Sequence, residues 1–290
     1  MIAAWSPMVV IHQAHAGIRR SALRRQLQSV ASGNSTSLSV DLDQSGADVG
    51  AAIEEITNHL PIESMHVQRL VFAFKRSGTA DRVVERLAAE SPQQRLNSAR
   101  VVGALRLTEA VPWVAALLES DDRPVSDAGA RALGKIGGAR SATALVQAIQ
   151  RKGLNRRFVV ELARAAPDLF VEAALTQPQR SAVRPALAIA AGLRRRQTAV
   201  GPLIRLMEDG SRRERVISCR ALGWIGSGTA VPTITRALGD RDWKIRLSAA
   251  KALGALRAQS AQSELTYLRI DRNASVRKAA EQALYRLIPR

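Results

Sequence analysis

The chain has 290 residues, of which 46% are hydrophobic and only 3% aromatic, and its 43 Lys and Arg against 25 Asp and Glu give a net charge of +18. No apolar run approaches the roughly 18 residues of a membrane span, and a single cysteine excludes an internal disulfide. An apolar content carried by Ala, Leu, Val and Ile favours many closely packed helices over a β-sandwich. The positive charge predicts an acidic protein, a nucleic acid or an anionic membrane surface as the partner. We expect a cytoplasmic protein.

Residues 1–47 show no repeat and are predicted to form an N-terminal arm. Within it, residues 9–30 alternate apolar side chains with arginines, which indicates a basic amphipathic helix. The sequence leaves open whether this helix caps the first repeat or binds a membrane surface or a nucleic acid. Residues 31–47, rich in Ser, Gly and Asn, are predicted to be a flexible linker. The second domain is then residues 48–290.

This second domain is built from a repeat. Arg215, Arg246 and Arg277 are each 31 positions apart, and Gly223 and Gly254 keep the same step. Each unit shows a short apolar helix, a polar turn and a longer second helix, whose terminal glycine lets the next backbone approach closely. One such pair cannot bury its own apolar face, so neighbouring pairs must stack. The sequence therefore predicts an all-α fold, an α-solenoid of about eight stacked antiparallel helix pairs.

The repeat carries a recognisable signature. Pro232, Asp240, Ile245 and Arg246 resemble the Pro, Asp, Val and Arg of HEAT repeats, and the Ala-Leu-Gly endings resemble bacterial HEAT-like repeats of the phycobilin-lyase type. The resemblance is strong in the last three units and weak in the first, and Ser126 stands where Arg is expected. It implies a right-handed superhelix whose second helices line a concave face.

Acidic and basic residues recur at a fixed spacing, and we interpret them as residues that stabilise the fold, the scaffold pairs. In each of the last three units an Arg follows an Asp by six positions: Asp209 and Arg215, Asp240 and Arg246, Asp271 and Arg277. We expect each Asp to cap a second helix and to meet Arg side chains of its own or the next unit, with Arg246 as the partner of Asp240. The alternative is a row of arginines for phosphates.

A second set of basic residues predicts a positive stripe along the concave groove. These residues stand five positions after the place in the repeat that the scaffold arginines occupy, or within two helical turns on the same face, with no acid at the shared position. An ordinary solvated face, which usually mixes charges, is the alternative. The predicted partner-binding residues are Arg69, Arg100, Arg131, Arg213, Arg220, Trp224, Lys244 and Lys251.

The sequence offers no catalytic motif. It has no Gly-rich phosphate loop, no metal-binding His and Glu pattern and no nucleophile with an assigned base, so no catalytic, cofactor or metal residue and no small-molecule substrate is predicted. Cys219 is expected to be buried and inert. We interpret the chain as a non-catalytic scaffold that holds an acidic partner, foremost a protein, in the basic groove.

Two alternatives from other classes stay open. The first is binding of DNA or RNA, with Trp224 placed for base stacking; a relative of the HEAT-like alkylpurine DNA glycosylases would also need a carboxylate in the groove, and none is found. The second is an assembly factor similar to the bilin lyases, against which the low aromatic content argues.

Overall fold

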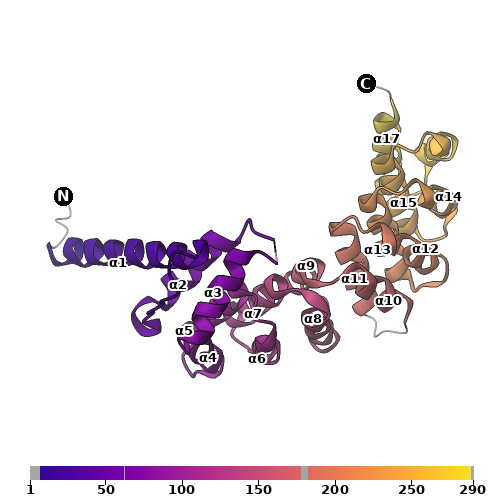
Figure 1. Ribbon diagram of the computed structural model, residues 1–290. Coiled ribbons are helices and arrows are strands. Elements are labelled where there is room, and N and C mark those ends of the chain that lie inside the picture. The colour runs from indigo at the N-terminus through magenta and orange to yellow at the C-terminus, as the bar shows by residue number, and fades with distance from the viewer. Residues whose placement is uncertain (1–6, 62, 178–181, 289–290) are drawn as a thin grey trace. The chain divides into compact units, whose positions relative to one another are not determined.

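The computed structural model describes residues 7–61, 63–177 and 182–288; for residues 7–16 and 44–45 it describes the backbone alone. The described residues form seventeen α-helices and seven 3₁₀ turns and contain no strand (Figure 1). The predicted all-α solenoid is confirmed. The chain divides into two compact units, unit 1 (Met1–Ile136) and unit 2 (Gly137–Arg290).

Each unit consists of helix pairs in chain order. The helices of unit 1 are α1 (Pro7–Ser32), α2 (Leu42–Thr57), α3 (Met65–Arg76), α4 (Thr79–Glu85), η1 (Arg86–Ala88), α5 (Pro92–Leu105), η2 (Thr108–Ala110), α6 (Val111–Leu117) and α7 (Arg123–Ile136). Those of unit 2 are α8 (Gly138–Lys152), α9 (Arg156–Ala165), α10 (Asp168–Thr176), α11 (Val183–Leu193), η3 (Gln197–Ala199), α12 (Val200–Asp209), α13 (Arg212–Ile225), η4 (Gly228–Ala230), α14 (Val231–Arg236), η5 (Ala237–Gly239), α15 (Trp243–Leu256), η6 (Gln259–Ala261), α16 (Gln262–Tyr267), η7 (Leu268–Ile270) and α17 (Ala274–Leu287).

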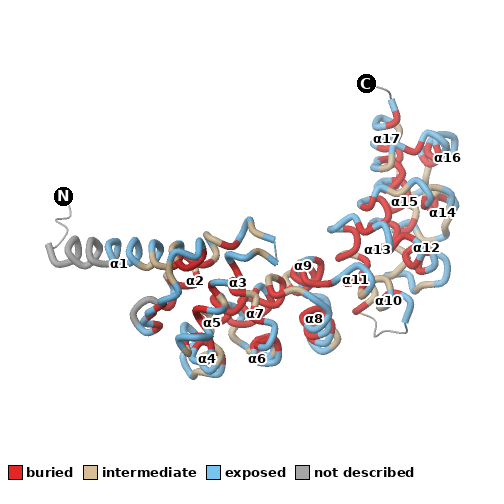
Figure 2. Tube along the Cα trace, in the orientation of Figure 1, coloured by how far each residue is buried: buried red, intermediate tan, exposed pale blue. Residues whose placement is uncertain are grey.

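Within each unit the second helices of the repeats pack side by side in a row. The row is α2, α5 and α7 in unit 1, and α9, α11, α13, α15 and α17 in unit 2. The first helices form a second layer: α4 packs on α5, α6 on α7, and α8, α10, α12, α14 and α16 each on the next row helix. Buried residues follow the sides on which the two layers meet (Figure 2). One face of each row therefore carries the polar residues of the second helices.

Small residues set the spacing within the row. A Cβ added at Gly254 would lie 2.8 Å from the Ala283 Cα, and one added at Gly223 would lie 2.9 Å from the Ala252 Cα. Both contacts are with the backbone of the next row helix, which cannot move aside cheaply. The expectation that the terminal glycines permit close backbone approach is confirmed.

The turns before the row helices correct one detail of the scaffold prediction. Asp240 does not cap α15; its Oδ1 accepts the Asp242 backbone N–H at 2.8 Å, and Asp242 is the N-cap, accepting the Lys244 N–H at 2.8 Å. Asp271 and Asn273 repeat this division of roles before α17. The first aspartate braces the turn and keeps an oxygen for an arginine, while the residue two positions later satisfies the helix N-terminus.

The start of the repeat domain also differs from expectation. The row continues from α5 to α2, whereas α3 packs mainly on α1 and α4. Residues 31–47, expected to be a linker, contain the start of α2 at Leu42, and Leu38 and Val40 are buried. These three apolar residues alternate along the chain, and their burial anchors a segment whose Ser and Gly content suggested flexibility.

The basic N-terminal helix lies against the first repeat. The C-terminal part of α1 buries Leu27 and Val30, and α1 packs on α2 and α3. Arg20 and Arg24 pair with Asp48 and Glu55 of α2 at 2.8 and 2.6 Å. These contacts favour the cap over a free arm. None of the helices that the structure describes is long and apolar enough to cross a membrane.

Candidate partner-binding site

The eight predicted partner-binding residues are divided between the two units, and all are exposed. Arg69, Arg100 and Arg131 belong to unit 1, whereas Arg213, Arg220, Trp224, Lys244 and Lys251 belong to unit 2. Each unit is therefore described separately.

Arg69 stands apart from the row that carries Arg100. It lies on α3, and its Nη1 donates to the Ser32 carbonyl at 2.9 Å and to the Ala31 carbonyl at 3.4 Å. These are orphan carbonyls at the C-terminus of α1, where a cation also meets the negative end of the helix dipole. Because α2 takes the place in the row that the 31-residue step assigned to α3, the step back from Arg100 reaches a residue that fastens α1.

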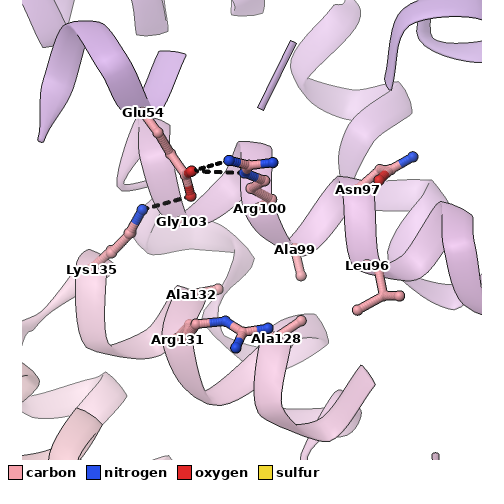
Figure 3. Close-up of a pocket in the computed structure, with 10 residues that line it drawn as sticks. All are labelled: Glu54, Leu96, Asn97, Ala99, Arg100, Gly103, Ala128, Arg131, Ala132 and Lys135. Carbon is pink, nitrogen blue, oxygen red and sulfur yellow. Dashed lines mark hydrogen bonds and ion pairs between the residues drawn. The ribbon is translucent and has the colours of Figure 1, made fainter. Parts of the chain in front are cut away.

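A hollow of about 380 Å³ lies between α2, α5 and α7, and we call it the first hollow (Figure 3). Figure 3 shows the Glu54 carboxylate of α2 between Arg100 of α5 and Lys135 of α7. Arg100 reaches Glu54 Oε2 through Nη2 at 2.5 Å and Nε at 2.7 Å, and Lys135 Nζ reaches Oε1 at 2.7 Å. Both carboxylate oxygens are thus held by charge-assisted hydrogen bonds.

The contacts with Arg100 and Lys135 keep Glu54 negatively charged. Burial is the largest single effect and acts to raise the pKa of its carboxyl, but the hydrogen bonds from Arg100 and Lys135 together with their positive charges outweigh it and hold the pKa below its ordinary value of 4.5. Arg131 lines the same hollow, and no described carboxylate forms an ion pair with it. Sequence reasoning missed Glu54 because α2 lies outside the regular repeat.

The corresponding face of unit 2 has a hollow of about 370 Å³ between α13, α15 and α17, the second hollow. Three of the predicted residues meet here, Arg220, Trp224 and Lys251. Trp224 is 41% exposed as a residue, and the Arg220 Cζ lies 5.6 Å from the centroid of its ring, within range of a cation–π interaction. The rest of the lining is Ser248, Gln282, Arg286 and small Gly and Ala residues.

Arg286 is a site residue that sequence reasoning missed. It follows Gln282, which occupies the predicted position on α17, by one helical turn, just as Lys135 follows Arg131 on α7. Within the part of the chain that the structure describes, no carboxylate pairs with Arg220, Lys251 or Arg286. The second hollow thus holds three cations and no acid.

Arg213 and Lys244 are exposed but lie outside the lining of the second hollow. Both stand near the start of their helices, α13 and α15. The Lys244 Nζ lies 5.6 Å from the centroid of the Trp243 ring. Neither contributes to the hollow itself.

The scaffold arginines pair forward, into the next repeat. Arg246 meets Asp271 through Nε–Oδ2 at 2.7 Å and Nη2–Oδ1 at 2.9 Å, and Arg215 meets Asp240 at 2.5 Å. The prediction that Arg246 is the side-chain partner of Asp240 was wrong. Arg246 contacts only the backbone carbonyl of Asp240, at 2.9 Å. Hydrogen bonds with Arg246 lower the pKa of Asp271, so this pair is charged at neutral pH.

Departures from the scaffold pattern have local causes. The Ser126 hydroxyl donates to the carbonyl eight positions earlier, that of Leu118, at 3.1 Å, as Arg215 Nε does to Met207 at 2.8 Å. Serine keeps this hydrogen bond within its own repeat, but its side chain is too short to reach an acidic residue of the next repeat. In the repeat that contains α12 the helix continues through Asp209, so the turn seen at Asp240 does not form there. Arg184 accordingly pairs with Glu214, at 3.5 Å, and not with Asp209.

Other reactive groups contribute little. Cys219 is fully buried in α13, and burial raises the pKa of its thiol to about 12. Among the residues that the structure describes, no group of three or more His, Cys, Asp or Glu side chains is placed to hold a metal ion.

Comparison with known proteins agrees with the repeat pattern. The family model for HEAT repeats matches residues 80–163 and 202–285, more than half of the chain. It describes HEAT repeats in general and does not single out the phycobilin-lyase type. No match is found among curated proteins.

Similar solved structures include human deoxyhypusine hydroxylase in complex with glycerol, at 20% sequence identity over 84% of this chain and 96% of that chain, with a TM-score of 0.39. They also include an engineered protein, at 18% identity over 84% of this chain and 83% of that chain, again with a TM-score of 0.39. At these scores the likeness carries no argument about function. On the strength of the matched repeats, the chain belongs to the HEAT-repeat family.

Proposed function

We propose that the protein is a HEAT-repeat scaffold that binds an acidic macromolecule, foremost a protein, on the polar face of its row helices. The observation that carries the proposal is the second hollow, where Arg220, Lys251 and Arg286 gather around Trp224 without an acidic neighbour in the lining. No catalytic step is part of the proposal.

The charge arrangement supports this reading because many other cations of the chain are already neutralised. Arg100, Arg184, Arg215 and Arg246 each have a carboxylate partner. Several like charges left together attract an acidic surface and repel a basic one, which speeds and orients association. An exposed Trp beside Arg is also the composition typical of interface residues that dominate binding energy.

A nucleic acid is the second candidate, favoured by one observation. Trp224 is exposed and has Arg220 over its ring, which suits stacking of an unpaired base next to a phosphate contact. Against it, the anion held by the cations of the first hollow is a carboxylate, that of Glu54.

The test is a fluorescence-anisotropy titration of the full chain with two labelled probes at near-physiological salt, a polyglutamate of about 20 residues and a duplex of about 20 base pairs that carries a short single-stranded overhang. We expect polyglutamate to bind and the duplex to bind no tighter than about 0.1 mM, the weak end of non-specific affinity. The opposite order would refute the proposal, particularly with a duplex slope of log K against log salt of roughly −4 to −5, as expected for about five phosphate contacts.

A further inference from the structure

The two hollows occupy the same place in the repeat. Arg100 and Lys135 line the first, and the residues 151 positions later in each case, Lys251 and Arg286, line the second. In both hollows the first cation of the pair lies on one row helix and the second on the next. The two pairs therefore hold equivalent positions on α5 and α7 and on α15 and α17.

The floors of the hollows correspond as well. Three small residues of the first lining match three of the second at the same offset: Gly103 with Gly254, Ala128 with Ala279, and Ala132 with Ala283. In both, a Cβ added at the glycine would meet the Cα of the matched alanine, Ala132 or Ala283, at 2.8 Å. The same close helix contact underlies both cation pairs, so their backbone spacing is set in the same way.

The first hollow shows what such a pair binds. One cation holds each oxygen of the Glu54 carboxylate, at 2.5–2.7 Å. The carboxylate comes from α2, the row helix before α5. In unit 2 the row helix before α15 is α13, which brings Arg220 and Trp224 to the hollow in place of an acid.

We propose that Lys251 and Arg286 form a carboxylate clamp that binds an Asp or Glu side chain of a protein partner. The inference rests on the proposed function and deepens it by naming the recognised group and the two residues that hold it. Lys251 takes one carboxylate oxygen and Arg286 the other, while the exposed Trp224 ring packs against the methylene groups of the same side chain or its neighbours. Arg220, stacked on that ring, adds attraction at longer range.

The experiment uses the full chain and labelled polyglutamate of about 20 residues at near-physiological salt. The test variant is Lys251→Ala/Arg286→Ala. The matched control is Arg205→Ala/Lys278→Ala, which also removes one Arg and one Lys from exposed positions of unit 2 but outside the hollow. We expect the test variant to weaken binding by about tenfold or more, because charged hydrogen bonds are lost, and the control by less than about twofold. Circular dichroism and the urea midpoint verify that both variants fold.

A gain of binding provides a second arm. Glu54→Ala removes both the internal anion and the side chain that carries it, leaving Arg100 and Lys135 open, so we expect tighter polyglutamate binding, and adding Lys135→Ala should cancel the gain. Equal losses in the test and control variants, or an unchanged affinity in Glu54→Ala, would overturn the clamp while the scaffold proposal stands. Failure of the unmodified chain to bind polyglutamate at all, with tight binding of a duplex, would instead overturn the proposed function.

Discussion

Replacing Arg246 by alanine tests whether the forward ion pairs between repeats hold the fold together. The Arg246 side chain is only 15% exposed and that of Asp271 only 5%, so the charge left on Asp271 would be largely cut off from water. Breaking a buried ion pair typically costs about 3–5 kcal/mol. Asp271 keeps its hydrogen bond from the Asn273 backbone at 2.7 Å, which lowers our expectation to about 2–3 kcal/mol.

The measurement is urea unfolding followed by circular dichroism. A loss of this size shifts the midpoint by roughly 1 M at an m-value of about 2–3 kcal/mol/M. Lys251→Ala is the control on the same helix: its exposed side chain has no described ion pair, and we expect less than about 0.5 kcal/mol. A cycle with Asp271→Ala should show a coupling within the range of about 0.5–3 kcal/mol found for contacting residues.

The effect should also be local. Repeats contact only their neighbours, so the loss is expected between α15 and α17. Hydrogen exchange should therefore speed up in α17 of Arg246→Ala while α5 keeps its protection. Equal urea midpoints for Arg246→Ala and Lys251→Ala, or faster exchange spread evenly over the chain, would refute the reasoning.

Three further outcomes follow from single residues. Gly254→Ala is expected to destabilise the fold by about 1–3 kcal/mol, because its Cβ would press on the Ala283 backbone, whereas Gly228→Ala, with open space around it, should leave the urea midpoint nearly unchanged. The folded-state pKa of Glu54 is lowered, so its pairs stabilise fully above its ordinary 4.5 and lose that contribution as the pH falls below it; Glu54→Gln should flatten the thermal midpoint against pH there, and an unchanged curve would contradict the clamp. Cys219, with a thiol pKa of about 12, should resist a thiol reagent at about pH 8 until urea is added, and rapid labelling of the folded chain would show that it is accessible.

Much of the fold could be predicted because the repeats of this one sequence can be aligned with one another. Gly223 and Gly254 share a position, and a residue that recurs at the same step is constrained by the same packing each time. The first repeat could not be predicted in this way. Because α2 and α3 do not follow the repeat pattern, nothing in the sequence indicated that α2 would join the row. Counting 31 positions back from Arg100 therefore led to Arg69 on α3, outside the row.

The partner of Arg246 shows a limit of a different kind. In this periodic sequence Arg215 and Arg246 each have an aspartate six positions before them and another 25 positions after them. The two pairings recur with the same period, so spacing alone cannot separate a contact within one repeat from one between repeats. Only the stacking direction of the helices selects Asp271 over Asp240. Arg286 was missed because the uncharged Gln282 stands at the repeated position on α17, so the basic column gave no sign of the cation one turn later.

The contrast between the two hollows follows from what lies next to each pair of cations. In unit 1 the neighbour is α2, a helix outside the regular repeat, and it supplies Glu54. In unit 2 the neighbour is α13, a regular repeat helix that also packs against α11, where the Trp224 ring lies so close to Gly192 that an added Cβ would come within 2.7 Å of it. In the lining of the second hollow α13 supplies Arg220, Gly223 and Trp224, and none of these carries a carboxylate. Beside the irregular helix the chain neutralises its own cation pair with Glu54, whereas the equivalent pair in the regular array has no acid in its lining, and there we propose that a partner supplies the carboxylate.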